Sequence, residues 1–314
     1  MKEHCWHILL NLNANEKKSE SRWLPIATKL QSIGIRYELH RLTKPGDGIA
    51  TAKSLCENGI RHLVAVGGDG TLNEVVNGIF TSGVNTHEVL LAVLPLGRGN
   101  DWVRTHHYPN DIDETIDLWL DGQFMQHDIG KVTSNTPDKQ TAERYFINIA
   151  GFGFDADVIY DVTNHPPHLF GFNVYILSLL KTLLSHKPKA IQVSDNNGFT
   201  FSGEVFMVIA AICQYNGGGI REAKYAVPDD GLLDLIVVPK MSTLQVLAQL
   251  KNMQSGDHIE KLKGVRIIQT TDVQISSEQI FRAETEGELL TVGDYNIQLI
   301  PNALNVLTAI DNKQ

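Results

Sequence analysis

The chain has 314 residues and a formal net charge of −9; 42% of its residues are hydrophobic and 20% are charged. This is the composition of a globular protein, and at roughly 150 residues per domain the length predicts two domains. The negative charge argues against nucleic acid as a main partner. It also argues against broad electrostatic attachment to acidic membranes, although a local basic patch is compatible with it. No stretch approaches the ~18 consecutive apolar residues of a membrane-spanning helix.

The N-terminal residues and the cysteines indicate the compartment. Residues 1–7 lead directly into a predicted strand and lack the layout of a signal peptide. Cys5, Cys56 and Cys213 are scattered and odd in number. Their spacing predicts neither a metal-binding pair nor a disulfide framework, as is typical of a reducing cytosol. We therefore expect a cytoplasmic protein.

Residues 1–125 alternate between predicted strands and predicted amphipathic helices. Such alternation predicts a parallel sheet with helices on both faces, whose ligands bind beyond the carboxyl ends of the strands. The predicted strands are 6–11, 36–40, 62–66 and 90–94, and the apolar helix faces include Trp23, Ile26 and Leu30; Ile49, Ala52 and Leu55; and Ile112, Ile116 and Trp119.

Residues 126–300 consist mainly of short predicted strands, which indicates a second, β-rich domain. Predicted helices interrupt them at 170–186 and 244–253. The first helix offers an apolar, lipid-facing surface, although packing against a core is the more common use of such a stripe. Residues 301–314 are expected to return to the first domain. The predicted strands are 126–132, 144–149, 191–194, 200–213, 232–238, 265–271, 279–283 and 296–300.

The glycine-rich stretch at residues 67–74 follows the predicted buried strand at 62–66 and leads into a predicted helix. A strand, a glycine turn and a helix together present free backbone N–H groups at the helix N-terminus, and glycines let an anion approach them. The pattern therefore predicts a phosphate site. Its members are Gly67, Gly68, Asp69, Gly70, Thr71, Leu72, Asn73 and Glu74.

Asp69 places a negative charge beside that anion. The repulsion predicts an offsetting metal ion or proton, as a Mg²⁺-nucleotide or a substrate hydroxyl would supply. The alternative is a tight turn in which Asp69 and Thr71 cap the helix. A second loop, at 95–101, follows the next predicted strand. Because both loops end neighbouring strands, we expect them to converge on one ligand.

Further motifs follow in a fixed order along the chain. They are His127-Asp128-Ile129-Gly130, Phe146-Ile147-Asn148 with Gly151-Phe152-Gly153, the glycines at 217–219, the acidic turn at 230–234 and Glu286-Gly287-Glu288. Together with the loops at 67–75 and 95–101, this set resembles the bacterial soluble diacylglycerol kinase and lipid kinase family, which is related to the sphingosine kinases. The first loop alone also occurs in NAD kinases and phosphofructokinases, whereas the ordered set is specific.

The resemblance implies a two-domain α/β fold. Residues 1–125 would form a Rossmann-like parallel-sheet domain of the NAD kinase and diacylglycerol kinase kind, and residues 126–300 a β-rich sandwich. It also implies ATP-dependent phosphorylation of a lipid hydroxyl, with ATP and Mg²⁺ as cofactors and the nucleotide in the cleft between the domains.

The same resemblance assigns nucleotide contacts. Residues 68–74 would hold the phosphates, and Thr43 would contact the nucleotide. Asn11 lies in a divergent loop, 11–15, where the family usually has Asn-Pro and a glycine. Arg98 stands where the family usually has Thr. Its guanidinium is able to pair with phosphate through two hydrogen bonds, or to block the nucleotide.

Glu288 is the first candidate for the group that accepts the hydroxyl proton, because the family's Asp-Gly-Glu is thought to supply the base. Glu286 replaces the family's Asp and is the second candidate. The alternative is a solvated acidic turn in which Glu284, Glu286 and Glu288 all face water. Asp128 would support the base, since two nearby carboxylates raise one pKa. The alternative interpretation of Asp128 is a residue at the start of a strand whose carboxylate accepts hydrogen bonds from nearby N–H groups.

The turn at 227–232 resembles the family's structural Mg²⁺ site. The resemblance implies three ligands: the carboxylate of Asp230 and the main-chain carbonyls of Val227 and Leu232, with waters filling the other positions. The alternative is an ordinary Pro-Asp-Asp-Gly turn.

The sequence thus favours a lipid kinase over two other functions. One is a kinase of a soluble acceptor such as NAD, and the other is a catalytically weak nucleotide-binding protein. The expected partners are a lipid with a free hydroxyl and, transiently, a membrane surface, to which the cytoplasmic protein would attach peripherally. The lipid is not named by the sequence, and a homodimer stays open.

Overall fold

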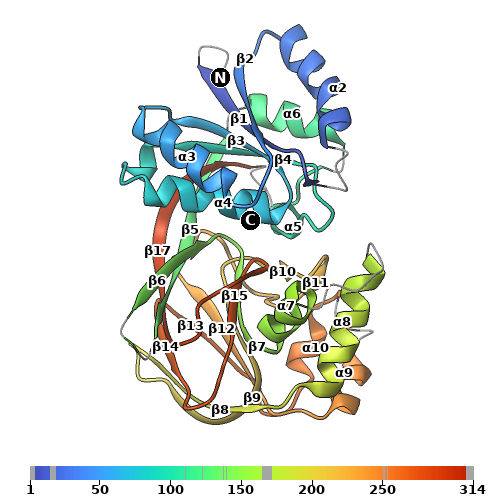
Figure 1. The fold of residues 1–314 in the computed structure, drawn as a ribbon, viewed down its shortest axis with the longest axis vertical. Helices are drawn as coiled ribbons and strands as arrows, with labels where there is room; N and C mark the ends of the chain where they lie inside the picture. The colour runs from blue at the N-terminus through green and yellow to red at the C-terminus, as the bar shows by residue number, and fades with distance from the viewer. Residues whose placement is uncertain are drawn as a thin grey trace.

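The computed structural model describes residues 4–14, 19–109, 111–121, 123–136, 138, 140–164, 172–249, 252 and 254–308. It has an α/β part, formed mainly by the first 121 residues, and a β-rich part (Figure 1). The two-domain α/β fold class predicted from the sequence is therefore confirmed. Among the described residues, no helix is long and apolar enough to cross a lipid bilayer.

The α/β part consists of β1 (Cys5–Asn11), α2 (Ser19–Ser32), β2 (Arg36–Leu42), α3 (Asp47–Glu57), β3 (His62–Gly67), α4 (Asp69–Thr81), η1 (Thr86–Glu88), β4 (Leu90–Pro95), α5 (Asp101–Thr105) and α6 (Ile112–Asp121). Its strands are parallel, in the order β4-β3-β1-β2. Successive side chains of β1 point to opposite faces. Leu9 belongs to the core with α3 and α4, whereas Ile8 and Leu10 pack with α2 and α6.

The β-rich part has mainly antiparallel strands, with β9 at its centre between β7, β8 and β12. Its elements are β5 (Phe124–Asn135), β6 (Thr141–Phe146), β7 (Ile149–Gly153), α7 (Phe154–Asn164), α8 (Phe172–Ser185), β8 (Lys189–Asp195), β9 (Thr200–Ala211), β10 (Tyr215–Asn216), β11 (Ile220–Arg221), β12 (Leu233–Pro239), α9 (Thr243–Gln249), α10 (Asp257–Glu260), β13 (Arg266–Thr270), β14 (Asp272–Ser276), β15 (Ala283–Thr285), β16 (Glu288–Leu289) and β17 (Asp294–Leu307).

The helices α7 and α10 are not among the elements predicted from the sequence. α7 begins directly after Gly153, whose φ of 90° ends strand β7 in a conformation that favours glycine. Asp155 and Asp157 lie in its first turn, where negative charge is favourable. The predicted helix at 170–186 is α8. Among its described side chains Leu183 is buried and Leu184 is exposed, so it has both a core face and an apolar outer face.

Strands β5 and β17 run between the two parts (Figure 1). They pair antiparallel with each other, and near its end β17 also pairs in parallel with β4, through Asn305 opposite Leu90. Residues 301–307, in the segment expected to return to the first domain, thus lie in β17. Residues 309–314 of that segment lie outside the described residues.

Candidate active site

The glycine-rich loop joins β3 to α4 and contacts the loop that follows β4. The carbonyl of Gly67 accepts hydrogen bonds from the N–H groups of Leu96 (2.8 Å) and Gly97 (2.9 Å). A Cβ on Gly97 would lie 2.3 Å from Cα of Gly68, so only glycine allows this approach. The two loops expected to converge therefore do so through backbone contact.

These loops form one wall of a pocket of about 320 Å³, here called the phosphate pocket. The N-terminus of α4 opens into it, which favours an anion. Lys44 and Arg98 supply positive charge at its rim, and Glu288 lines it as well. The lining residues are Asn11, Asn13, Ala14, Leu42, Lys44, Pro45, Gly68, Gly70, Thr71, Glu74, Gly97, Arg98 and Glu288.

The predicted phosphate-binding stretch divides into pocket-lining and buried residues. Gly68, Gly70, Thr71 and Glu74 line the pocket. Leu72 packs in the core, and the buried side chain of Asn73 donates to the carbonyl of Tyr145 (3.0 Å) and accepts from Arg144 (2.8 Å). The side chains of Leu72 and Asn73 therefore hold the helix against the β-rich part.

Other predicted nucleotide contacts lie at or near the same pocket. Asn11 donates from Nδ2 to the Thr71 hydroxyl (2.9 Å), which fixes the divergent first loop against the helix. The carboxylate of Glu74 accepts from the N–H groups of Gly46 (2.8 Å) and Gly48 (2.9 Å). Thr43 is exposed and donates to Asp47 (3.0 Å), and it does not line the pocket itself.

A second pocket, of about 270 Å³, adjoins the first and shares Gly70 with it. We call it the acidic pocket, because five carboxylates from both parts of the molecule line it. It is lined by Asp69, Gly70, Gly99, Asp101, Asn148, Asp155, Ile159, Asn216, Gly217, Gly218, Glu284, Glu286 and Gly287.

Glu286 lies in this acidic pocket with its backbone in the left-handed region, at φ 51°. Its Oε1 accepts from the N–H groups of Ile147 (2.6 Å) and Asn148 (2.7 Å). Its Oε2 is buried and has no hydrogen-bond partner among the residues that the structure describes. Burial, with the charge of Asp69 as a smaller cause, raises the pKa of Glu286 to about 8. A carboxyl group with one bare oxygen is suited to exchange a proton with a ligand.

Glu284 lies beside Asp155, each with one buried oxygen that lacks a partner in the described part of the chain. A Cβ on Gly151 would meet both, Glu284 Oε1 at 2.6 Å and Asp155 Oδ2 at 3.0 Å. Burial, reinforced by Asp155, raises the pKa of Glu284 to about 8. Glu284 is only 2% exposed. The solvated-turn alternative is therefore wrong for Glu284 and Glu286, and holds for Glu288, which is exposed.

Asp69 and Asp101 form the wall that the two loops contribute. Asp69 Oδ1 accepts from the N–H of Trp102 (3.0 Å), so it caps α5 and not its own helix. Asp101 Oδ2 accepts from the N–H of Gly218 (2.7 Å), in the triple-glycine segment, and Oδ1 lies 3.3 Å from Arg104 Nε. Burial, followed by the charge of Asp69, raises the pKa of Asp101 to about 6.

Asp128 does not line either pocket. Its two oxygens accept from the N–H groups of Gly231 (2.8 Å) and Asn302 (2.6 Å), and its own N–H donates to Pro228 (2.8 Å). This is the bonding that the alternative interpretation predicted: a buried strand residue that joins β5 to the acidic turn and to β17. The structure does not bring Asp128 beside Glu288.

The predicted metal turn is formed, with Asp230 Oδ1 accepting from the N–H of Leu232 (2.9 Å) and Gly231 at φ 76°. The carboxylate of Asp230 is exposed, and so is Val227. Asp234 lies close by with a buried Oδ2 that has no partner among the described residues, and burial raises its pKa to about 6. A partly desolvated carboxylate beside an exposed one fits a hard cation such as Mg²⁺.

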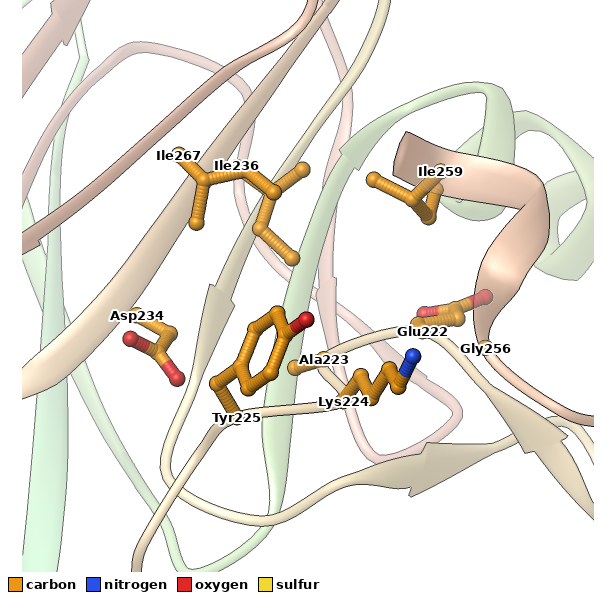
Figure 2. Close-up of a pocket in the computed structure, with 9 residues that line it drawn as sticks. All are labelled: Glu222, Ala223, Lys224, Tyr225, Asp234, Ile236, Gly256, Ile259 and Ile267. Carbon is orange, nitrogen blue, oxygen red and sulfur yellow. The ribbon is translucent and has the colours of Figure 1, made fainter. Parts of the chain in front are cut away.

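A third hollow is lined by residues 222–225, by Asp234, Ile236 and Ile267, and by Gly256 and Ile259 at α10 (Figure 2). Its volume of about 10 Å³ is near the lower limit for a single water molecule. It is therefore too small for a substrate. Glu222 reaches from its edge toward the acidic pocket and accepts a hydrogen bond from Asn216 (3.3 Å).

Sequence reasoning missed Asp101, Asp155 and Glu284 as site residues. Asp101 ends the second loop, and Asp155 lies two residues after the motif Gly151-Phe152-Gly153. Both therefore stood beside motifs that were already noted. Glu284 lies two residues before the motif Glu286-Gly287-Glu288, but only burial distinguishes it from a surface acid.

Comparisons with known proteins agree with this architecture. Residues 5–132 match the diacylglycerol kinase catalytic domain, and residues 148–308 match the YegS C-terminal NAD kinase beta sandwich-like domain. A diacylglycerol kinase of Staphylococcus aureus is 30% identical over 304 residues, which cover 94% of this chain and 88% of that protein. One of Staphylococcus saprophyticus is 28% identical over 295 residues, covering 91% and 92%.

Solved structures show the same fold. A crystal structure of a diacylglycerol kinase from Bacillus anthracis has a TM-score of 0.70 at 18% identity, covering 98% of this chain and 97% of that one. An NAD kinase from Archaeoglobus fulgidus in complex with ATP is more distant, with a TM-score of 0.51 at 13% identity, covering 97% and 94%. The resemblance inferred from the ordered motifs is confirmed: the chain belongs to the diacylglycerol kinase family, a family of phosphotransferases.

Proposed function

We propose that the protein transfers the γ-phosphate of ATP to the hydroxyl group of a lipid of the diacylglycerol type. The observation that carries this proposal is the meeting of two pockets at Gly70. One lies at a helix N-terminus and suits phosphates. The acidic pocket presents carboxylate oxygens that have no hydrogen-bond partner among the described residues, and such oxygens are suited to accept a hydrogen bond from a hydroxyl group.

In this proposal the acceptor hydroxyl enters the acidic pocket. Its oxygen attacks the γ-phosphorus, the bond to the β-phosphate oxygen breaks, and ADP leaves. The hydroxyl proton passes to the bare Oε2 of Glu286 in its ionised form, and from there to solvent. Glu286 is preferred to Glu288 as the base because its Oε2 is buried and its Oε1 is held by two N–H groups. Glu288, exposed at the phosphate pocket, would instead adjust the charge around the nucleotide.

The family implies Mg²⁺, and the oxygen donors fit it at two places. Asp69 and Asp101 would hold an ion beside the phosphates, and Asp230 with Asp234 would hold one in the acidic turn. When bound, Mg²⁺ neutralises phosphate charge during transfer. The protein's own part is to keep Asp69 and Asp101 in place, through the N–H groups of Trp102 and Gly218.

The test is transfer of label from γ-labelled Mg-ATP to a panel of diacylglycerol, phosphatidylglycerol, a sphingoid base and a prenol, with NAD as the soluble acceptor. We expect labelled lipid and no labelled NAD. A thermal shift with Mg-ATP measures binding separately. Retained ATP binding without labelled product would support a weak nucleotide-binding protein, and labelled NAD alone would support a soluble-acceptor kinase. Either result would overturn the proposal.

A further inference from the structure

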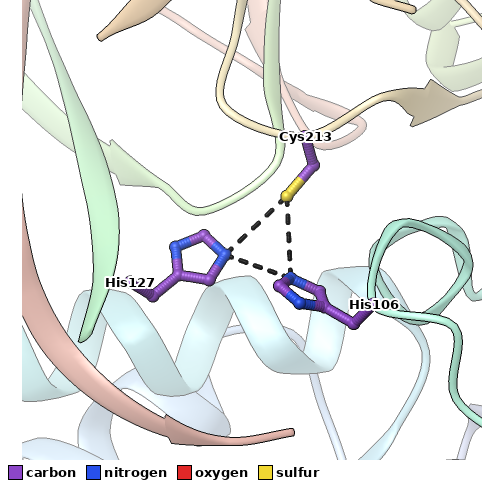
Figure 3. A group of neighbouring side chains, drawn as sticks. All are labelled: His106, His127 and Cys213. Atoms are coloured by element: carbon purple, nitrogen blue, oxygen red, sulfur yellow. Dashed lines mark hydrogen bonds between the residues drawn. The ribbon is translucent and has the colours of Figure 1, made fainter. Parts of the chain in front are cut away.

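Two histidines and a cysteine converge where the α/β part meets the β-rich part. His106 follows α5, His127 lies in the strand β5 that leaves the α/β part, and Cys213 follows β9 (Figure 3). Their side chains point at one another, and the residues are 6%, 0% and 0% exposed. None of the three lines the phosphate pocket or the acidic pocket.

The distances among their ligand atoms match those around a metal ion. His106 Nε2 and His127 Nε2 are 3.3 Å apart, and Cys213 Sγ lies 3.9 Å from the first and 3.7 Å from the second. A tetrahedral zinc ion, with Zn–N of about 2.05 Å and Zn–S of about 2.3 Å, separates two nitrogen ligands by about 3.3 Å and a nitrogen from a sulfur by about 3.6 Å.

The backbone orients His127 for this purpose. Its Nδ1 lies 2.5 Å from the carbonyl oxygen of Asp128, and because a carbonyl only accepts, Nδ1 carries the proton. Nε2 is then unprotonated and able to accept, at 3.3 Å from His106 Nε2 and 3.7 Å from Cys213 Sγ. Histidines that bind metals typically donate their other ring N–H in this way. Trp102 Nε1 is 3.1 Å from the same Nε2, so in the metal-free form the indole N–H donates to it.

We propose that His106, His127 and Cys213 bind one transition-metal ion, with Zn²⁺ as the best match. One thiolate and two imidazoles suit zinc, whereas Mg²⁺ and Ca²⁺ need oxygen ligands. Binding releases the thiol proton to solvent and displaces the Trp102 N–H from His127. The carbonyl of Ile147, 3.5 Å from Sγ, is the nearest candidate for the fourth position.

The charge of the site is balanced by its surroundings. Zn²⁺ with one thiolate and two neutral imidazoles carries a net charge of +1. The carboxylates of Asp69 and Asp128 act electrostatically on Cys213, so they would stabilise that positive charge. A buried cation at this place therefore has the counter-charges that burial requires.

The ion would fix the junction of the two parts beside the acidic pocket. The N–H of Cys213 donates to the carbonyl of Asn148 (3.1 Å), and the N–H of Asn148 donates to Glu286. The next residue, Gln214, donates from its N–H to the hydroxyl of Thr105 (3.0 Å), which precedes His106. The bound ion would hold the two parts together whichever acceptor is phosphorylated.

The first test is the metal content of the full-length chain, purified without chelator and with any affinity tag removed. We expect about one zinc per chain. X-ray absorption at the zinc edge should show two nitrogen neighbours at about 2.05 Å and one sulfur at about 2.3 Å. This measurement needs no variant. A chain that contains no metal and takes up none on addition of Zn²⁺ would leave only a hydrogen-bonded cluster and overturn the proposal.

The second test replaces zinc with Co²⁺ and records the sulfur-to-cobalt charge-transfer band. Cys213→Ser should abolish the band. His127→Gln removes a proposed ligand, so it should weaken Co²⁺ binding by more than the about tenfold to hundredfold that is lost when only a residue supporting a ligand is changed. Cys56→Ser, in another buried cysteine, should leave the band unchanged. His40→Gln controls for the other histidine group, His7, Glu38 and His40, where a metal would also find three ligands. A band that survives Cys213→Ser, or binding lost only in His40→Gln, would refute the proposed site.

Discussion

The carboxylate of Glu286 accepts a hydrogen bond of 2.7 Å from the backbone N–H of Asn148. This contact holds the turn between β15 and β16 against the connection between β6 and β7, and it aims the other oxygen of Glu286 into the acidic pocket. The left-handed backbone conformation of Glu286 costs about 1 kcal/mol or more of conformational strain. Such strain is typical of residues that a functional site holds in place.

Replacing Glu286 should lower turnover far more than replacing Glu288. Glu286→Gln keeps an oxygen to accept the two N–H bonds but removes the proton acceptor, so kcat should fall about 100-fold or more. Glu288→Gln, at an exposed position of the phosphate pocket, should change KM for ATP by only a few-fold. Steady-state kinetics of the two variants would decide between them, and a larger kcat loss in Glu288→Gln would restore Glu288 as the base.

The activity should rise with pH toward about 8. Because the pKa of Glu286 in the free protein is about 8, only the ionised minority accepts a proton near neutral pH. We therefore expect kcat/KM to rise from pH 6, to reach half its maximum near pH 8, and to level off about one pH unit above that. Profiles of wild-type and Glu286→Asp should differ in the position of the midpoint. A flat profile across this range would exclude Glu286 as the titrating base.

The folded state should lose stability over the same pH range. Glu284 and Glu286 each have a pKa near 8, raised from an ordinary value of 4.5. A carboxyl group whose pKa is raised in the folded state contributes its full stabilisation below about pH 4.5. This contribution is lost as the pH rises through about 8. The Tm should fall from pH 5 to pH 8, and Glu284→Gln should make that fall shallower. Calorimetry in buffers of matched ionic strength measures both slopes.

Gly97→Ala should disturb the phosphate pocket through the backbone. Its Cβ would lie 2.3 Å from Cα of Gly68 and force the two loops apart, at a cost of about 1–3 kcal/mol in unfolding free energy. Gly70→Ala is the matched comparison, because in the described part of the chain no heavy atom outside its chain neighbours and its own helix backbone lies within 4 Å of its Cβ, and its stability should stay near that of wild type. Equal denaturant midpoints for the two variants would contradict the contact.

Asp128→Asn should act on stability and not selectively on turnover. The two oxygens of Asp128 accept from Gly231 and Asn302, and an amide offers only one oxygen, so one N–H loses its partner. We expect about 1–3 kcal/mol less unfolding free energy, with kcat per folded molecule nearly unchanged. Urea titration and active-site-normalised kinetics would show this. Unchanged stability with a large fall in kcat would return Asp128 to the mechanism.

Local sequence determined the glycine turn that forms one wall of the phosphate pocket. Strand, glycine turn and helix are contiguous in residues 62–81, and the residues that shape the turn are those that the loop itself contains. The α/β half, and the strand-rich second half, follow equally from hydrophobic periodicity, which reports the environment of each element without reference to its neighbours. Even the order of the motifs sufficed to indicate the family.

Only the tertiary structure decided which carboxylates share a pocket and which groups meet at the junction. Glu284 approaches Asp155, and Glu286 lines the same pocket, because β15 pairs with β7 across more than 100 residues of sequence. The left-handed turn then sends Glu286 inward and leaves Glu288 exposed, which simple alternation does not predict. Likewise, the spacing of the three cysteines showed no metal pair, yet the fold places Cys213 between two histidines. Burial and long-range pairing set these relationships, and neither is encoded in local spacing.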